Sequence, residues 1–198
     1  MSPISSTLAN ASAYGYRTFA AAAAGAYESI ATVTPSGSTN TVTFSSIPST
    51  YASLQLRIIV RGTANAGTTP LYLRVRANGD TTSTYPYYYI SGLGTGISAG
   101  RDTTATAMIL GLYADSGYAS NIFGITILDI HNYASTTQNK TFRSFSGVDN
   151  NTSTGGELRL SSGLWMTTSA INSLTIINNG GDNYSSSSSF ALYGIKGA

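Results

Sequence analysis

The sequence predicts an all-β protein: an antiparallel β-sandwich or jelly roll of about ten short strands, preceded by an extended N-terminal arm. Only 9% of the 198 residues are charged and Cys is absent, while Ser, Thr, Gly, Asn and Tyr fill the connections between short apolar runs. This composition is typical of many short strands joined by polar turns. No segment shows a convincing helical period of apolar residues. A chain of this length fits one domain better than two.

Residues 1–26 are predicted to form the arm and residues 27–198 the sandwich. The first segment is rich in Ser and Ala and shows a period of neither two nor 3.6 residues. It is either a disordered tail or an arm that becomes ordered on a partner. In the second case its anchors are Tyr14, Tyr16, Arg17 and Phe19.

The strand pattern begins at Tyr27–Val33 and Thr41–Phe44 and is clearest after residue 53. There, Leu54, Leu56, Ile58 and Val60 share one phase, which we expect to be buried. The run Leu71–Ala77 repeats the alternation, and Asn78-Gly79-Asp80 then supplies a turn. Further strands are expected at Tyr85–Ile90, Ala107–Tyr113, Ile122–His131, Lys140–Gly147, Glu157–Leu160, Leu174–Ile177 and Phe190–Ile195.

Four arginines occupy the phase opposite the expected core in two of these strands: Arg57, Arg61, Arg74 and Arg76. Ile59 is an apolar exception in the same phase. If the two strands are neighbours, the arginines cluster. They then form either a solvated sheet face or a docking patch for an acidic surface.

Three polar connections are long for hairpins, which favours surfaces that meet a partner. They are Gly62–Pro70, Gly92–Ala105 and Asp149–Gly156. The third has oxygen-bearing residues at alternate positions, as a calcium loop does, but Thr154 stands where such a loop needs glycine. No metal site is therefore expected there.

Catalysis is not expected. The segment Gly96–Gly100 fits the spacing of a nucleophile elbow around Ser98, yet neither the strand before it nor the helix after it is predicted. His131 is the only histidine, and it falls near the end of a strand, where a structural role is the default. One histidine without cysteine does not make a zinc site. We expect no catalytic residue, cofactor or metal.

The tyrosines of Tyr85–Ile90 and the single Trp165 allow either packing or a sugar-binding platform. Alternation sends Tyr85, Tyr87 and Tyr89 to one side of the strand and Tyr88 to the other. Some of these rings must then lie in the core or at a subunit interface.

Charge and hydropathy argue against two classes of partner. Ten basic and eight acidic residues give a net charge of +2, too weak a field to hold a phosphate backbone, so no nucleic-acid partner is expected. No run approaches the roughly 20 apolar residues that cross a bilayer, so no membrane span is expected. The first basic residue is Arg17, so the basic region of a secretory signal is missing and synthesis in the cytoplasm is expected.

Several stretches in a fixed order resemble a family of tailed-bacteriophage virion proteins. They are Tyr27–Val33, Leu54–Arg57, Asn78-Gly79-Asp80, Leu128–Ile130 with Asn132-Tyr133-Ala134, Ser161–Trp165 and Phe190–Gly197. The resemblance spans nearly the whole β region and leaves the arm outside it.

This resemblance implies a capsid decoration (cement) protein or a tail-associated structural protein. It implies a homotrimer whose partners are its own copies and the major capsid protein, located on the capsid surface after synthesis in the host cytoplasm. The alternative is a tail-fibre or receptor-binding module that recognises host surface polysaccharide.

Overall fold

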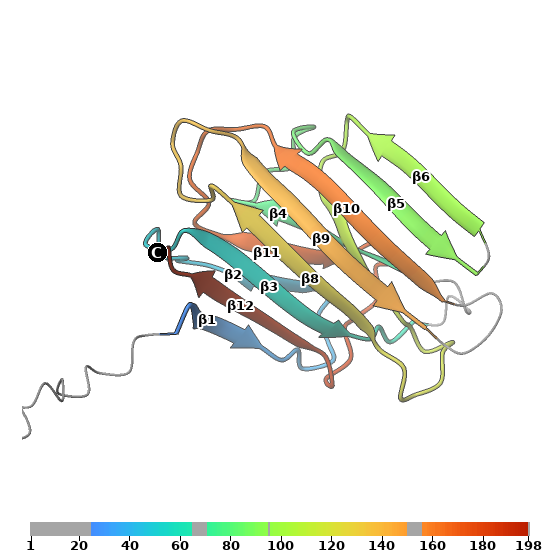
Figure 1. The fold of residues 1–198 in the computed structure, drawn as a ribbon. Helices are drawn as coiled ribbons and strands as arrows, with labels where there is room; N and C mark the ends of the chain where they lie inside the picture. Colours follow the sequence, from blue (N-terminus) through green and yellow to red (C-terminus); the bar gives the residue numbers. More distant parts are fainter. Residues whose placement is uncertain (1–24, 65–70, 95, 150–155, 198) are drawn as a thin grey trace, which may run out of the picture.

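The computed structural model describes residues 25–64, 71–94, 96–149 and 156–197, which form two antiparallel β-sheets packed face to face (Figure 1). The eight-stranded sheet has the order β1-β12-β3-β8-β9-β10-β5-β6, and the four-stranded sheet the order β2-β11-β4-β7. The strands are β1 (Tyr27–Val33), β2 (Thr41–Phe44), β3 (Ser53–Val60), β4 (Leu71–Ala77), β5 (Tyr87–Leu93), β6 (Gly96–Asp102), β7 (Met108–Tyr113), β8 (Gly124–His131), β9 (Lys140–Val148), β10 (Glu157–Trp165), β11 (Leu174–Asn178) and β12 (Ser189–Ile195). The predicted β-sandwich is confirmed.

Alternation of side chains explains most of these strands. In β3 the predicted set Leu54, Leu56, Ile58 and Val60 is buried, and in β10 every second residue from Glu157 to Trp165 is buried. A period of two places one set of side chains between the sheets and the other set outside. The apolar phase of each strand therefore faces the opposing sheet.

The core lies between the two sheets. Leu56, Leu128 and Phe142 of the eight-stranded sheet are buried together with Val75 and Ile176 of the four-stranded sheet. Burial of each such side chain stabilises the fold by about 1.5–3 kcal/mol relative to exposure. This shared core fixes which face of the larger sheet is left outside.

The predicted turn at Asn78 and Gly79 is confirmed, since both residues have positive φ angles, of 52° and 68°. Asp80 donates its amide to the carbonyl of Ala77 at 2.9 Å. The turn does not join neighbouring strands, because it leads from β4 in the smaller sheet to β5 in the larger one (Figure 1).

The prediction of one loop was wrong. The region 92–105 was predicted as a polar connection, but it contains the end of β5 and the whole of β6. The Gly96–Gly100 segment, whose spacing resembles a nucleophile elbow, is itself an edge strand paired with β5. Its small, weakly patterned side chains gave no strand signal, and pairing with β5 supplies the order that the segment lacks by itself.

The predicted arm falls almost wholly outside the described residues, which begin at residue 25. The four proposed anchors Tyr14, Tyr16, Arg17 and Phe19 lie in that outside part, as does most of the region weighed as a calcium loop.

Candidate functional site

The outer face of the eight-stranded sheet, turned away from the four-stranded sheet, carries two rows of apolar side chains. In the first row Ile127, Phe145, Leu160 and Ile90 lie opposite one another across β8, β9, β10 and β5. The second row runs through Ile59, Ile125, Gly147, Leu158, Gly92 and Ile97. We call the large apolar residues of both rows the apolar face: Ile59, Ile90, Ile97, Ile125, Ile127, Phe145, Leu158 and Leu160.

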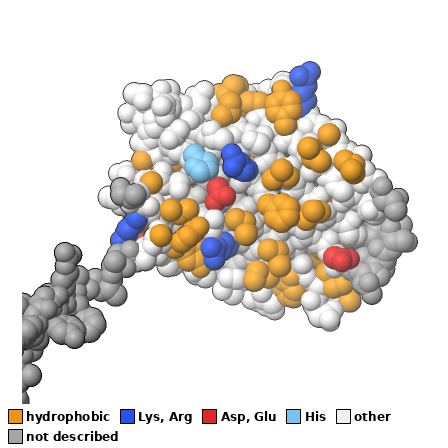
Figure 2. Space-filling view, viewed as in Figure 1, with side chains coloured by type: hydrophobic (Ala, Val, Ile, Leu, Met, Phe, Trp, Pro, Cys, Tyr) orange, Lys and Arg blue, Asp and Glu red, His pale blue; other side chains and the backbone are white. Residues whose placement is uncertain are grey.

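These side chains are exposed, from 38% for Ile127 to 85% for Ile97. Figure 2 shows hydrophobic groups spread across this side of the molecule, with few charged groups among them. Eight large apolar side chains, each more than one third exposed, thus lie on six adjacent strands, and contiguous apolar patches of this kind mark interaction sites. The outward face of an antiparallel sheet is ordinarily polar. This breadth of apolar surface is the signature of an interaction site.

A hollow lies within the apolar face. It has a volume of about 780 Å³, and its lining includes Ile125, Phe145, Leu158, Gly92 and Gly147. The two glycines stand on either side of Leu158 in the second row, where side chains would otherwise project. A Cβ added at Gly92 would meet no atom within 4 Å, and one added at Gly147 would lie 3.4 Å from the Leu158 side chain. Glycine at these positions therefore helps to leave the hollow open.

A polar row borders the apolar face. Asp129 accepts a hydrogen bond from the Gln55 side-chain amide at 2.8 Å, and Gln55 in turn accepts one from Arg57 Nε at 2.7 Å. The Arg57 guanidinium also lies 5.3 Å from the ring centroids of both Tyr27 and Tyr193. These cation–π contacts and hydrogen bonds hold Arg57 within its own chain.

The structure does not bring the four predicted arginines together. The strands β3 and β4 are not neighbours, because they belong to different sheets. Arg57 is exposed on the larger sheet, and Arg74 and Arg76 are half-buried on β4. Arg61 is buried and donates to the backbone carbonyls of Tyr118, Ala119 and Ile122. Its role is to hold a loop in place.

The predicted alternation of the tyrosines is confirmed. Tyr85 and Tyr87 are buried and Tyr89 is half-buried, whereas Tyr88 is 59% exposed. Tyr88 lines a second hollow of about 550 Å³ on the outer face, together with Ile90, Leu160, Ser162 and Arg101. Tyr89 also lines this hollow, but Tyr88 is the tyrosine of β5 whose side chain is mostly exposed.

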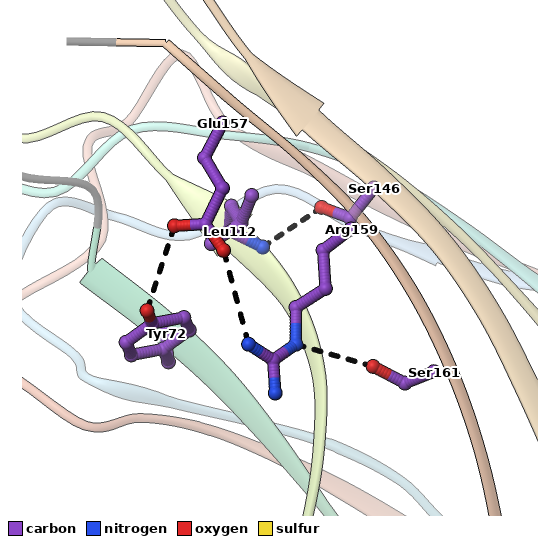
Figure 3. A network of polar contacts seen from close by, with 6 residues as sticks. All are labelled: Tyr72, Leu112, Ser146, Glu157, Arg159 and Ser161. Carbon is purple, nitrogen blue, oxygen red and sulfur yellow. Dashed lines mark hydrogen bonds and ion pairs between the residues drawn. The ribbon is translucent and has the colours of Figure 1, made fainter. Parts of the chain in front are cut away.

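A polar network lies between the sheets, behind the apolar face (Figure 3). Glu157 and Arg159 of β10 form a buried ion pair at 3.8 Å. The Arg159 guanidinium stacks 3.6 Å from the ring centroid of Tyr89 and donates from Nε to Ser161 at 3.2 Å. Tyr72 of β4 donates its hydroxyl to Glu157 at 3.5 Å. Burial raises the pKa of Glu157, and burial together with the Glu157 charge raises the pKa of Tyr72.

This network is enclosed: Glu157 is 8% exposed and Arg159 4%. Each polar group in it has a partner within the chain, and its members come from both sheets. Such an arrangement links the two sheets, and Glu157 also lines the hollow in the apolar face.

Lys140 is another buried cation. Its Nζ donates to the backbone carbonyls of Ser135, Gln138, Thr167 and Thr168 at 2.6–3.4 Å. Burial lowers its pKa. Because its nitrogen is surrounded by carbonyls, Lys140 ties two connecting segments together.

The remaining candidates for chemistry are dispersed. His131 is exposed at the end of β8, in the phase of Ile125, Ile127 and Asp129 as the sequence indicated. The described residues contain no group of three His, Cys, Asp or Glu side chains placed to hold a metal ion. Within the same residues no helix is long and apolar enough to cross a membrane.

Sequence reasoning did not find the apolar face. A signal was present, because Ile125 and Ile127 alternate with Leu128 and Ile130 in β8, so both phases of that strand are apolar. Strands that are apolar in both phases are typical of sheets covered on both faces.

Comparison with protein-family models, curated proteins and solved structures gave no match.

Proposed function

We propose that this chain is a non-enzymatic structural protein of a bacteriophage virion, a capsid decoration protein that binds and stabilises the assembled head as a homotrimer. The observation that carries the proposal is the apolar face, a broad surface on a rigid sheet that is suited to assembly. The family resemblance of the sequence supplies the setting: its partners are its own copies and the major capsid protein, and its location is the capsid surface.

The mechanism that this function requires is thermodynamic linkage. A protein that binds only the assembled lattice stabilises that lattice by mass action. Several copies held in one oligomer bind with an avidity that exceeds the affinity of each. The chain has no cysteine, so its durability outside the cell must come from buried surface and not from disulfides.

We further infer that the sandwich is a jelly roll extended by two insertions. Its support is the strand order: β1-β12-β3-β8 in one sheet and β2-β11-β4-β7 in the other. Taken in chain order, these eight strands change sheet at every step except from β4 to β7, as the strands of two interlocked Greek keys do. The pairs β5-β6 and β9-β10 then extend the larger sheet beyond β8, and they carry five of the eight residues of the apolar face.

The experiment offers labelled protein to heads stripped of it and, separately, to intact host cells. Saturable and stoichiometric uptake by heads alone is the expected result. Uptake by cells that host polysaccharide competes away would replace the proposal with the receptor-binding alternative. The hollow beside Tyr88 and Arg101 is the described surface that would then be tested for a glycan.

A further inference from the structure

We propose that the apolar face is covered in solution by a second copy of this chain, whose β6 edge lies in the hollow between Phe145 and Leu158. The inference deepens the proposed function, because it names the surface through which the copies of the oligomer meet. It rests on the chemistry of the face, on the shape of the hollow and on the exposure of β6.

The charges beside the face do not call for a charged partner. Arg57 is held by Gln55 and by the rings of Tyr27 and Tyr193, and Asp129 accepts from Gln55. Arg143, exposed on β9, lies opposite Asp129 in the register, so the charges beside the face are of both signs. A strongly acidic or strongly basic partner therefore gains little there, since it meets like charge as well as opposite charge. A copy of this chain, with a net charge of +2 over 198 residues, provides a weakly charged surface.

The size of the apolar face agrees with a protein partner. The face extends over six adjacent strands, from β3 to β6, which is about 24 Å at a strand spacing of ~4.8 Å, and a standard stable interface buries about 800 Å² on each partner. A single sugar or peptide side chain in the hollow would leave most of both apolar rows in water. A second folded copy covers them together.

The hollow shows which part of the copy must enter it. Two apolar faces packed with their hollows aligned would leave a void, which costs stability. A projecting apolar group is needed instead. Ile97 on β6 is the most exposed large apolar side chain of the described residues, at 85%. It stands on the edge strand and is free to enter a neighbour's hollow.

The edge of β6 is an unpaired strand edge without the usual protection. It is the last strand of the eight-stranded sheet, and all seven residues from Gly96 to Asp102 are exposed or half-buried. Edge strands are usually protected by Lys, Pro, a bulge or a covering segment. β6 has no Lys, no Pro and a regular register with β5, and its charged residues, Arg101 and Asp102, stand only at its end. Docking against a neighbour covers this edge.

Ile97 and the hollow lie at different places on the apolar face, so each copy inserts its Ile97 into one neighbour and receives the Ile97 of another. Repeating this heterologous contact around an axis closes a ring. A trimer is such a ring. One contact then covers two surfaces that are exposed in the free chain, since the β6 edge of each copy lies against the apolar face of the next.

The absence of cysteine allows a direct cross-linking test with the double variant Ile97→Cys/Phe145→Cys. Two strands, β10 and β5, separate β9 from β6. The introduced residues are thus about 14 Å apart within a chain at a strand spacing of ~4.8 Å. A disulfide requires Cα atoms within about 7 Å. Any disulfide between the two positions therefore joins two chains.

Mild oxidation should convert the double variant into reducible dimers and closed trimers on a non-reducing gel. Each single variant should stay mostly uncrosslinked. The matched control is Ile97→Cys/Thr43→Cys, because Thr43 is exposed on β2 of the other sheet. Equal cross-linking of the control, or cross-linking of Ile97→Cys alone as the main product, would overturn the edge-to-hollow contact.

Light scattering provides a second measurement. Phe145→Lys places a charge on an already exposed position, so the fold should persist while the oligomer dissociates to monomer; Thr43→Lys should leave the oligomer intact. A monomeric unmodified protein would overturn the inference. Binding to heads separates the two proposals. Saturable binding by a protein that does not form the cross-link would contradict only this inference. A protein that forms the cross-link but does not bind heads would contradict only the proposed function.

Discussion

Trp165 donates its indole N–H to the carboxylate of Asp80 at 2.7 Å, which joins the end of β10 to the turn after β4. Asp80 also accepts hydrogen bonds from the backbone and hydroxyl of Thr82 and from the hydroxyl of Thr84. The Trp165 ring in turn stacks on Tyr85, with 6.5 Å between centroids. The Asp80 carboxylate thus orders the turn after β4 and holds Trp165 in place beside Tyr85.

Asp80 should make stability depend on acid. Burial acts to raise its pKa, but the hydrogen bonds from Thr82, Trp165 and Thr84 together lower it below the ordinary 3.8. A carboxyl with a lowered folded pKa contributes stability above its unfolded pKa and loses it as the pH falls through the folded value. We expect Asp80→Asn to cost about 1–2 kcal/mol at pH 7. The deficit should shrink below pH 3.8.

Urea unfolding at pH 7 and at pH 3 measures this effect. Asp102→Asn is the matched control, since Asp102 accepts from the backbone of Thr104 in an exposed turn. A deficit for Asp80→Asn that stays constant between the two pH values would contradict the assignment.

The buried pair of Glu157 and Arg159 should show strong coupling. Removal of one partner leaves a buried charge alone, so Arg159→Met is expected to cost about 3 kcal/mol at pH 7. Burial already raises the pKa of Glu157, and Arg159 is the charge that lowers it, so the variant raises that pKa further. A raised carboxyl pKa favours the fold at low pH and ceases to do so as the pH rises through it. The cost should therefore be smaller at pH 4 than at pH 7.

A double-mutant cycle by urea unfolding tests the coupling. Glu157→Gln/Arg159→Met removes both charges and should recover part of the loss seen for Arg159→Met. Additive losses from the two single variants would show that the pair acts as two independent contacts.

Substitution by alanine should lower stability at one glycine of the larger sheet and have little effect at another. A Cβ at Gly124 would contact the Leu112 carbonyl and lie 2.7 Å from the Cα of Tyr113, both backbone atoms of β7, whereas a Cβ at Gly92 meets nothing within 4 Å. Gly124→Ala should cost about 2 kcal/mol or more, because the two sheets must separate to admit it. Gly92→Ala should change stability by less than about 0.5 kcal/mol. Thermal unfolding of both variants compares them directly, and equal losses would be the contrary result.

Removal of residues 1–24 tests the proposed arm. We expect the shortened chain to keep a cooperative unfolding transition, because the described strands and the core between them are built from residues 27–195. Binding to heads should be lost if Tyr14, Tyr16 and Phe19 are its anchors. A triple alanine variant at these three positions in the full chain is the matched test. Unchanged head binding by both proteins would refute the arm as the attachment.

Local patterns predicted most of the strands because a period of two is visible wherever one face is buried. Leu54 to Val60 shows it clearly, and all four core positions of that strand are buried as predicted. The pattern failed at β6, where Gly96, Ser98 and Gly100 carry no apolar signal. It also ended β10 at Leu160, although the strand continues through Ser161 and Gly163 to Trp165. In both places pairing with a neighbouring strand, not local preference, sets the conformation.

The sequence by itself determined the β class, the approximate strand positions and the Asn78-Gly79 turn, because these depend on neighbours within a few residues. Only the tertiary structure decided which strands share a sheet. That choice separated Arg57 from Arg74 and lined up Ile127, Phe145, Leu160 and Ile90 across four strands. Sheet order depends on contacts between residues far apart in the chain, and no local period encodes them. The apolar face is therefore a product of the strand order.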